Sequence, residues 1–199
     1  MCGLFAAKSK EDLLELAKLN IHRGSRTHSV STFVGGELTI AKFDGEFNAE
    51  NVPDKADYYI CHIQAPTSQS AKAHPAIVGP INGKCSHVWH NGILKSDYMN
   101  DCSFKWDTAH IAEMMYHDRD IGTLDGSFAC FHYQDGKLNV FRNEISPLFV
   151  GTDGQFSSTK TKLTPVALDA NKVFNIELFP FTLTVVKEFK TLNNPYFFM

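Results

Sequence analysis

Short apolar segments joined by glycine-containing turns are the feature that most limits what this chain can fold into. The dipeptides Gly35-Gly36, Asp135-Gly136 and Asp153-Gly154 each separate two runs rich in Val, Phe, Leu and Thr. Such dipeptides are typical of tight turns between antiparallel strands. The pattern predicts strands over residues 31–34, 38–43, 58–64, 87–94, 127–133, 138–142, 148–152 and 156–158, with two or three more in 166–189.

Only two segments favour helix. Ser9 followed by Asp12 loosely fits a capping box, which predicts a helix over residues 11–20 that ends before Gly24. A second helix is expected over 107–117, with Ile111, Met114 and Met115 on its buried side. Many strands and few helices predict one α+β domain over residues 1–199, built from two stacked antiparallel sheets with the helices outside.

Composition excludes several classes of protein. The 199 residues include 16 Phe and are 43% hydrophobic, which is too apolar for a disordered chain. With 19 basic and 22 acidic residues the net charge is −3, so we expect no nucleic-acid partner and no binding to an anionic membrane.

Cysteine usage and hydropathy bear on the compartment. The five cysteines are odd in number and show no C-x-x-C spacing, a usage that suits a reducing compartment. No apolar run approaches the roughly 20 residues of a membrane span, and the start of the chain lacks the features of a secretion signal. A cytoplasmic location is therefore expected.

Cys2 is the first candidate for chemistry. Removal of Met1 would leave a thiol and a free α-amine on one residue, and an amine with a pKa near 8 can accept the proton of the thiol. The alternative is a buried cysteine at the start of an edge strand.

Two further candidates have equally plain structural alternatives. Asn91-Gly92 offers a side-chain amide and an accessible backbone N–H for an oxyanion, but Asn-Gly is also a common tight turn that would break the strand over 87–94. Asp107 could hold a substrate ammonium, or it could be the N-cap of the second helix.

Metal and cofactor sites are not expected. His87 and His90 would point to opposite faces of a strand, and no glycine-rich phosphate loop is present. Trp89 and Trp106 are interpreted as packing residues.

The start of the chain, Met-Cys-Gly-Leu-Phe-Ala, resembles that of the class II (N-terminal nucleophile) glutamine amidotransferases. The resemblance covers roughly residues 2–160, and further elements follow in the order of that family. These elements are Arg23-Gly24, residues 62–68 (H-I-Q-A-P-T-S), His74-Pro75, His90-Asn91-Gly92-Ile93, Asp107-Thr108, residues 124–129 (L-D-G-S-F-A), Arg142 with Ser146-Pro147-Leu148, and Phe156-Ser157-Ser158.

The resemblance implies a four-layer αββα sandwich, the N-terminal nucleophile hydrolase fold, and a glutaminase reaction through a γ-glutamyl thioester on Cys2. It implies that Asn91 and Gly92 form the oxyanion hole, that Asp107 binds the α-ammonium of glutamine, and that Arg23 supports the loop around the N-terminus. No cofactor is implied.

The sequence departs from the family where the substrate is bound. Gln64 occupies the position of an arginine that binds the α-carboxylate, and a neutral amide cannot form a charged bidentate pair. Thr67, Ser68 and Lys72 lie near it in sequence and could compensate. Arg26, at a position where the family has aspartate, could supply the missing positive charge.

Three functions follow from the resemblance. The leading hypothesis is a stand-alone glutaminase that supplies ammonia to a separate synthase protein. A second is a hydrolase of γ-glutamyl amides or peptides that needs no partner, which Gln64 motivates. The third is a catalytically idle relative that serves as a binding or regulatory subunit.

Overall fold

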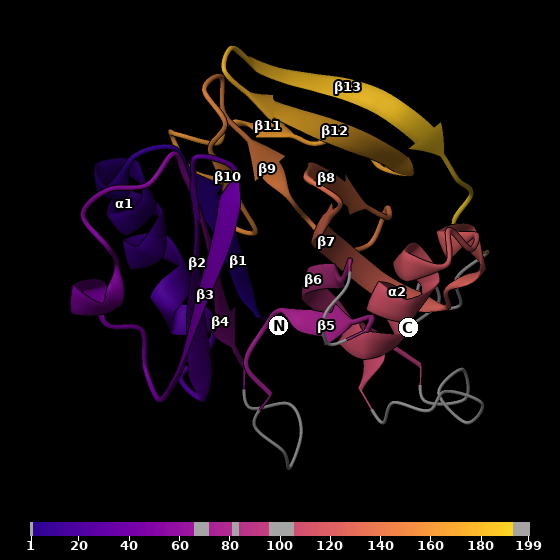
Figure 1. The fold of residues 1–199 in the computed structure, drawn as a ribbon, viewed down its shortest axis with the longest axis horizontal. Helices are drawn as coiled ribbons and strands as arrows, with labels where there is room; N and C mark the ends of the chain where they lie inside the picture. The colour runs from indigo at the N-terminus through magenta and orange to yellow at the C-terminus, as the bar shows by residue number, and fades with distance from the viewer. Residues whose placement is uncertain (1, 66–71, 81–83, 96–105, 193–199) are drawn as a thin grey trace. The chain divides into compact units, whose positions relative to one another are not determined.

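The computed structural model describes residues 2–65, 72–80, 84–95 and 106–192, which form two antiparallel sheets with few helices (Figure 1). The α-helices are α1 (Lys10–Asn20) and α2 (Asp107–Tyr116), and the short 3₁₀ helices are η1 (Ile21–Arg23), η2 (Ala49–Asn51) and η4 (Ile121–Thr123). The strands are β1 (Gly3–Ala7), β2 (Thr27–Val34), β3 (Glu37–Asp44), β4 (Tyr58–Gln64), β5 (Ala76–Val78), β6 (Ser86–Leu94), β7 (Gly126–Gln134), β8 (Lys137–Arg142), β9 (Phe149–Val150), β10 (Phe156–Ser157), β11 (Val166–Ala167), β12 (Lys172–Leu178) and β13 (Phe181–Glu188).

The strand order differs between the two sheets. The first sheet has the order β11-β9-β10-β1-β4-β2-β3, and the second has the order β13-β12-β8-β7-β6-β5. Strand β1 therefore lies inside the first sheet, paired with β4 on one side and β10 on the other.

The predicted hairpin turns are confirmed where glycine allows positive φ. Gly35 and Gly36, with φ of 58° and 85°, connect β2 to β3, and Asp135 and Gly136, with 55° and 77°, connect β7 to β8. Two consecutive residues at positive φ match the right-handed twist of the flanking strands.

By its contacts the chain divides into two compact units, of which the first comprises residues 2–74, 147–168 and 177–182. Its helix α1 packs against β1 and β4 of the first sheet, and the Ser9 hydroxyl caps the helix by accepting a hydrogen bond from Asp12 N at 3.1 Å. This confirms the predicted helix start. Leu13 and Leu16 of α1 are buried in a core with Phe5, Cys61 and other apolar residues of the sheet.

The second unit comprises residues 75–146, 169–176 and the described part of 183–199. Its helix α2 packs against β5 and β6. Ile111 and Met114 of the helix are buried beside Val88 and Phe128, with Met115 partly buried, so the predicted apolar side of this helix is confirmed. Helix α1 thus packs on strands of the first sheet and α2 on strands of the second.

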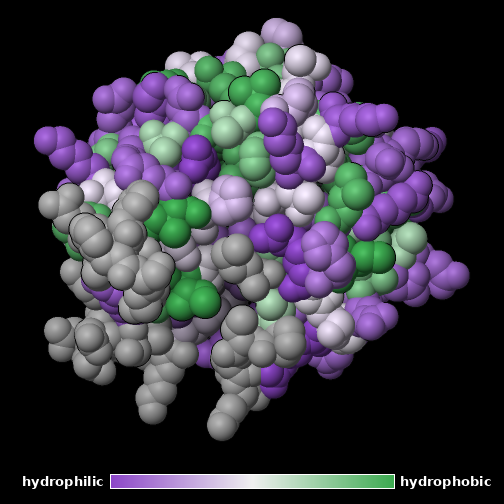
Figure 2. All heavy atoms as spheres, turned by 180° about the vertical axis from the view of Figure 1, so that it is seen from behind, coloured by the Kyte–Doolittle hydropathy of each residue, from purple (hydrophilic) through white to green (hydrophobic). Residues whose placement is uncertain are grey.

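The surface mixes polar and apolar side chains. On the face drawn in Figure 2, hydrophobic residues reach the surface in small groups that hydrophilic residues separate. No helix in the described part of the chain is both long enough and apolar enough to cross a membrane.

Candidate active site

Cys2 stands directly before β1, in the interior of the first sheet, and is only 8% exposed. A Cβ on Gly3 would lie 3.2 Å from the backbone O of Asn20, so Gly3 faces α1. Because side chains alternate along a strand, Cys2 and Leu4 project from the face that α1 does not cover. The alternative of a cysteine at an edge strand is wrong, since β1 has a strand on each side.

Arg23 fixes the backbone of Cys2. Its Nε donates to the carbonyl O of Cys2 at 3.0 Å, while Nη1 donates to Thr159 Oγ1 at 3.2 Å and to Ser158 O at 3.5 Å. Burial lowers the pKa of the guanidinium, and the nearby Cys2 acts in the opposite direction. The contacts fit the supporting position that the resemblance implies for Arg23.

A buried polar network surrounds this arginine, and the sequence did not reveal it. Asn20 Nδ2 donates to Ser157 Oγ at 2.9 Å, and Thr159 Oγ1 donates to Asn20 Oδ1 at 3.1 Å. Leu4 N donates to Ser158 Oγ at 3.2 Å. The two serines were recognised only as part of a motif, because their partners lie more than a hundred positions away in the chain.

Gln64 closes β4 with a buried side chain that is 6% exposed. Its Oε1 accepts hydrogen bonds from Thr27 Oγ1 at 2.9 Å and from Lys72 N at 3.1 Å. A backbone N–H can only donate, so the bond from Lys72 identifies the amide oxygen. Thr67 and Ser68, predicted beside it, lie outside the described residues.

The backbone of Gln64 is also closely packed. Its carbonyl O accepts a hydrogen bond from Arg26 N at 3.2 Å, and a Cβ on Gly24 would lie 2.3 Å from the same oxygen. Only glycine fits at position 24. The contact that the structure records between Arg26 and Gln64 is therefore a backbone contact.

His62, two residues earlier on β4, stacks on His74. The ring centroids are 3.6 Å apart with an angle of 24° between the planes, and both side chains are buried. Their spacing in the sequence gave no sign of this pair.

In the second unit, Asn91-Gly92 continues β6 and is not a turn. Asn91 pairs with Ala129 and Gly92 with Phe128 of β7, so the predicted break in the strand is wrong. Pairing along the whole strand outweighs the local preference of Asn-Gly. A Cβ on Gly92, which has φ of 157°, would lie 2.0 Å from Ser127 O.

Ser146, identified from the sequence only as part of a motif, and Asn143, which was not singled out, position this segment. Ser146 Oγ donates to the backbone O of Asn91 at 3.0 Å. Asn143 Oδ1 accepts from Phe128 N at 3.2 Å and from Ser146 N at 3.3 Å, and its Nδ2 donates to Gly126 O at 2.7 Å.

Asp107 is the first residue of α2, and Trp106 occupies the N-cap, so the N-cap alternative is wrong. The carboxylate accepts from Thr108 N at 2.8 Å through Oδ1 and from Leu94 N at 3.3 Å through Oδ2. His90 Nδ1 is 3.2 Å from Thr108 Oγ1 and 3.9 Å from Asp107 Oδ2. These contacts join the end of β6 to the start of the helix.

Two further predictions concern the tryptophans and the metal ligands. Trp89 is fully buried and Trp106 is partly buried against the core of its unit, which confirms both as packing residues. Within the described residues, no group of three His, Cys, Asp or Glu side chains is placed to hold a metal ion.

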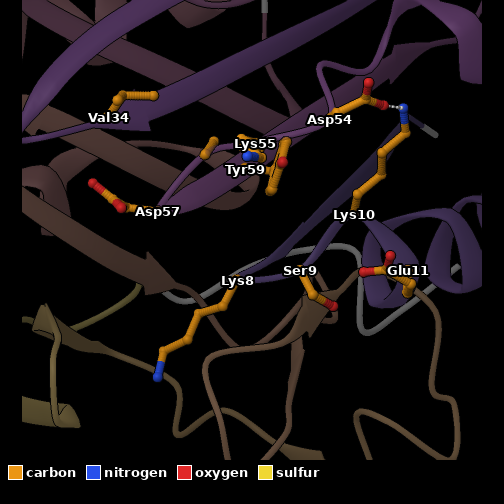
Figure 3. Close-up of a pocket in the computed structure, with 10 residues that line it drawn as sticks. Lys8, Ser9, Lys10, Glu11, Val34, Asp54, Lys55, Asp57 and Tyr59 are labelled. Carbon is orange, nitrogen blue, oxygen red and sulfur yellow. Dashed lines mark hydrogen bonds and ion pairs between the residues drawn. The ribbon is translucent and has the colours of Figure 1, made fainter.

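A cavity of about 350 Å³ lies at the start of α1 (Figure 3). Lys10 Nζ, at its rim, binds Asp54 Oδ1 at 2.7 Å. Its lining holds both lysines and carboxylates but none of the predicted site residues.

Comparison with known proteins shows that the fold of this chain is similar to that of solved structures. No protein-family model and no curated protein matches the sequence. The structure of the allosteric regulatory enzyme of purine biosynthesis superposes with a TM-score of 0.70 at 16% identity, covering 94% of this chain and 49% of its own. Glutamine phosphoribosylpyrophosphate amidotransferase from B. subtilis gives 0.66 at 16% identity, with the same coverage of 94% and 49%.

This chain has a class II glutamine amidotransferase-like fold. It spans about half the length of both enzymes. The predicted fold class, an α+β fold of two antiparallel sheets like that of the N-terminal nucleophile hydrolases, is therefore confirmed. A predicted glutamine amidotransferase from Pseudomonas aeruginosa PA01 has a TM-score of 0.43 at 13% identity, over 94% of this chain and 95% of its own.

Proposed function

We propose that this chain hydrolyses the γ-amide of glutamine, or of a related γ-glutamyl compound, with Cys2 as the nucleophile. The observation that carries the proposal is the position of Cys2. It immediately precedes an interior strand of a glutamine amidotransferase-like fold, and Arg23 binds its carbonyl at 3.0 Å.

The reaction starts with a proton transfer within one residue. Once Met1 is removed, the α-amine of Cys2 takes the thiol proton, and the thiolate attacks the γ-carbonyl carbon of the substrate. The C–N bond breaks, the nitrogen takes the proton from the α-amine and leaves as ammonia, and a γ-glutamyl thioester remains. Water then adds to the thioester, which releases the γ-carboxylate and restores the thiol.

Asn91 and Gly92 are the proposed oxyanion donors. The side-chain amide of Asn91 and the backbone N–H of Gly92 stabilise the oxygen that becomes negative in each tetrahedral intermediate, and loss of one such donor typically slows turnover by 10²–10³-fold. Asp107 is proposed to bind the α-ammonium. Thr67 and Arg26 are proposed to contribute at the substrate's other end with Gln64, and no cofactor takes part.

The name of the B. subtilis relative motivates an extension of this proposal. An amidotransferase delivers its nitrogen to an acceptor, and we propose that ammonia from this chain reaches a separate synthase protein. Glutamine hydrolysis measured with and without that protein would test the extension, because coupling predicts faster hydrolysis when the two proteins are mixed.

Intact mass tests the nucleophile directly. We expect tag-free protein to lack the mass of Met1 and to gain one adduct with 6-diazo-5-oxo-L-norleucine. The Cys2→Ala variant should gain none. Cys85→Ala, which removes another thiol that is not fully buried, should be labelled like the wild type.

Two results would contradict the proposal. An adduct that persists in Cys2→Ala would show that another residue reacts. Retention of Met1 with no adduct would remove the proposed base and favour the idle binding subunit.

A further inference from the structure

The orientation of the Gln64 amide is fixed by its surroundings. Oε1 accepts from Thr27 Oγ1 at 2.9 Å and from Lys72 N at 3.1 Å, so its two lone pairs are used. No hydrogen bond from Nε2 to a described residue is found. Gln64 therefore offers N–H donors to a ligand and no acceptor.

The strand order relates this amide to Cys2. Strand β4 lies between β2 and β1; Thr27 is opposite Gln64 on β2, and Gly3 is opposite Ile63 on β1, so Cys2 is level with Gln64. Thr27 Oγ1 binds Oε1 from β2, so Nε2, the other arm of the planar amide, is not the atom that faces Thr27. Both Cys2 and Gln64 belong to the sheet face that α1 leaves uncovered.

We propose that Gln64 Nε2 donates to the α-carbonyl oxygen of the substrate, and that Thr27 is the positioning residue that holds the amide in this orientation. The site then favours γ-glutamyl compounds whose α-carboxyl group is amidated, as in a peptide or an α-amide. This inference rests on the proposed function and names its substrate class.

The expected preference for an amidated α-carboxyl group follows from the absence of charge on Gln64. A carboxylate loses strong hydration when it is buried, and a charge-assisted bond that would compensate for this loss requires a cation. A neutral carbonyl has less hydration to lose and accepts the same N–H bond. The Arg23 guanidinium already binds Cys2 O and Thr159 Oγ1, so the cations to be tested are Arg26 and Lys72, whose backbone N–H groups bind Gln64.

Ammonia release from two substrates tests the preference. Glutamine and its α-N-methylamide each carry one primary amide, the γ-amide, so both report the same bond. We expect the wild type to give a higher kcat/KM with the methylamide. Gln64→Arg should reverse the preference by about tenfold or more, since it restores a charged fork for the carboxylate.

Variants of equal size separate positioning from folding. Thr27→Val should raise KM about tenfold for both substrates with kcat nearly unchanged, and Thr27→Ser should restore it, because one hydrogen bond is lost and then regained. Thr32→Val, at another buried threonine of β2, is the matched control and should leave KM unchanged. If Gln64→Arg does not fold, Gln64→Glu, whose carboxylate cannot donate, should lower kcat/KM for both substrates.

The outcomes distinguish this inference from the proposed function. A tenfold preference for glutamine that Gln64→Arg leaves unchanged, or that Arg26→Ala or Lys72→Ala abolishes, would overturn the inference alone, as would an unchanged KM in Thr27→Val. No turnover of either substrate, with no adduct on Cys2, would overturn both.

Discussion

The two regions that carry the proposed chemistry are held in place by different means. Around Cys2, the side chains of Arg23, Asn20 and Ser158 add a hydrogen-bond network to the strand pairing of β1. Around Asn91-Gly92, where Ser146 Oγ also binds Asn91 O, the distinguishing feature is close packing of the backbone, since a Cβ on Gly92 would lie 2.0 Å from Ser127 O.

This difference predicts how each region should respond to substitution. A side-chain network loses its members one at a time and weakens by steps. A backbone held at close approach tolerates no added atom, so a single methyl group should disturb the whole strand pair. Four substitutions break or sharpen this comparison, and they are taken from the largest expected effect to the smallest.

Gly92→Ala should have the largest effect. The added methyl group meets backbone atoms of Ser127, and alanine also disfavours φ of 157°, so we expect a loss of about 4 kcal/mol in the free energy of unfolding. Chemical denaturation measures it. Gly36→Ala is the control, because its φ of 85° is strained but nothing lies within 4 Å, and it should cost only about 1 kcal/mol. Equal losses would show that strain, not close packing, requires glycine at 92.

Asn91→Ala should reduce activity more than stability. We expect kcat to fall by 10²–10³-fold, about 3 kcal/mol, through loss of an oxyanion donor. Asn143→Ala is the comparison, since this buried amide only organises the backbone, and it should lower stability by about 2 kcal/mol with a smaller loss of kcat. A greater loss of kcat in Asn143→Ala than in Asn91→Ala would place the critical amide elsewhere.

His132 should make the second unit sensitive to acid. Burial lowers the pKa of this imidazole from 6.5 to about 4, and its Nε2 lies 3.1 Å from Ser86 Oγ. The unfolded chain binds a proton below its higher pKa while the native state does not, so stability is complete above 6.5 and falls as pH drops toward 4.

The full effect would be on the order of 3 kcal/mol, since each pKa unit corresponds to about 1.4 kcal/mol. Urea titrations at about pH 7 and about pH 5 measure how much the free energy of unfolding falls between the two pH values. The fall should be larger in the wild type than in His132→Asn. Identical pH dependence in both proteins would contradict the assignment to His132.

Arg23→Lys should have the smallest effect. Lysine keeps the charge but cannot reach Cys2 O, Ser158 O and Thr159 Oγ1 together, so we expect about tenfold slower turnover and a loss of about 1 kcal/mol in stability. Arg119→Lys, at an exposed position, should change neither. A small loss of stability in Arg23→Lys and a large one in Gly92→Ala would support the contrast between the two regions.

Much of the fold was predictable because local chemistry and tertiary structure agree. The Gly35-Gly36 hairpin, strand β4 over Tyr58–Gln64 and the Ser9 cap of α1 all form where the sequence indicates them. At Asn91-Gly92 the two disagree. The dipeptide favours a turn, but eight paired positions between β6 and β7 keep it extended.

Candidate site residues could be proposed from the sequence only where they stand in short motifs, as Cys2 and Asn91-Gly92 do. Thr27 and the stacked pair of His62 and His74 could not be proposed in this way, because each depends on a partner that only the folded backbone brings close. No spacing rule in the sequence reports such a contact.

The place of β1 in its sheet has a consequence for synthesis. Leu4 N donates to Ser158 Oγ across 154 positions of the chain, and β10 completes the side of β1 that β4 leaves open. Until that distant segment leaves the ribosome, β1 has an unpaired edge, and contacts between such distant residues form slowly. The nascent chain therefore carries Cys2 beside an open strand until β10 has been translated, and the region proposed to be catalytic is assembled only after that.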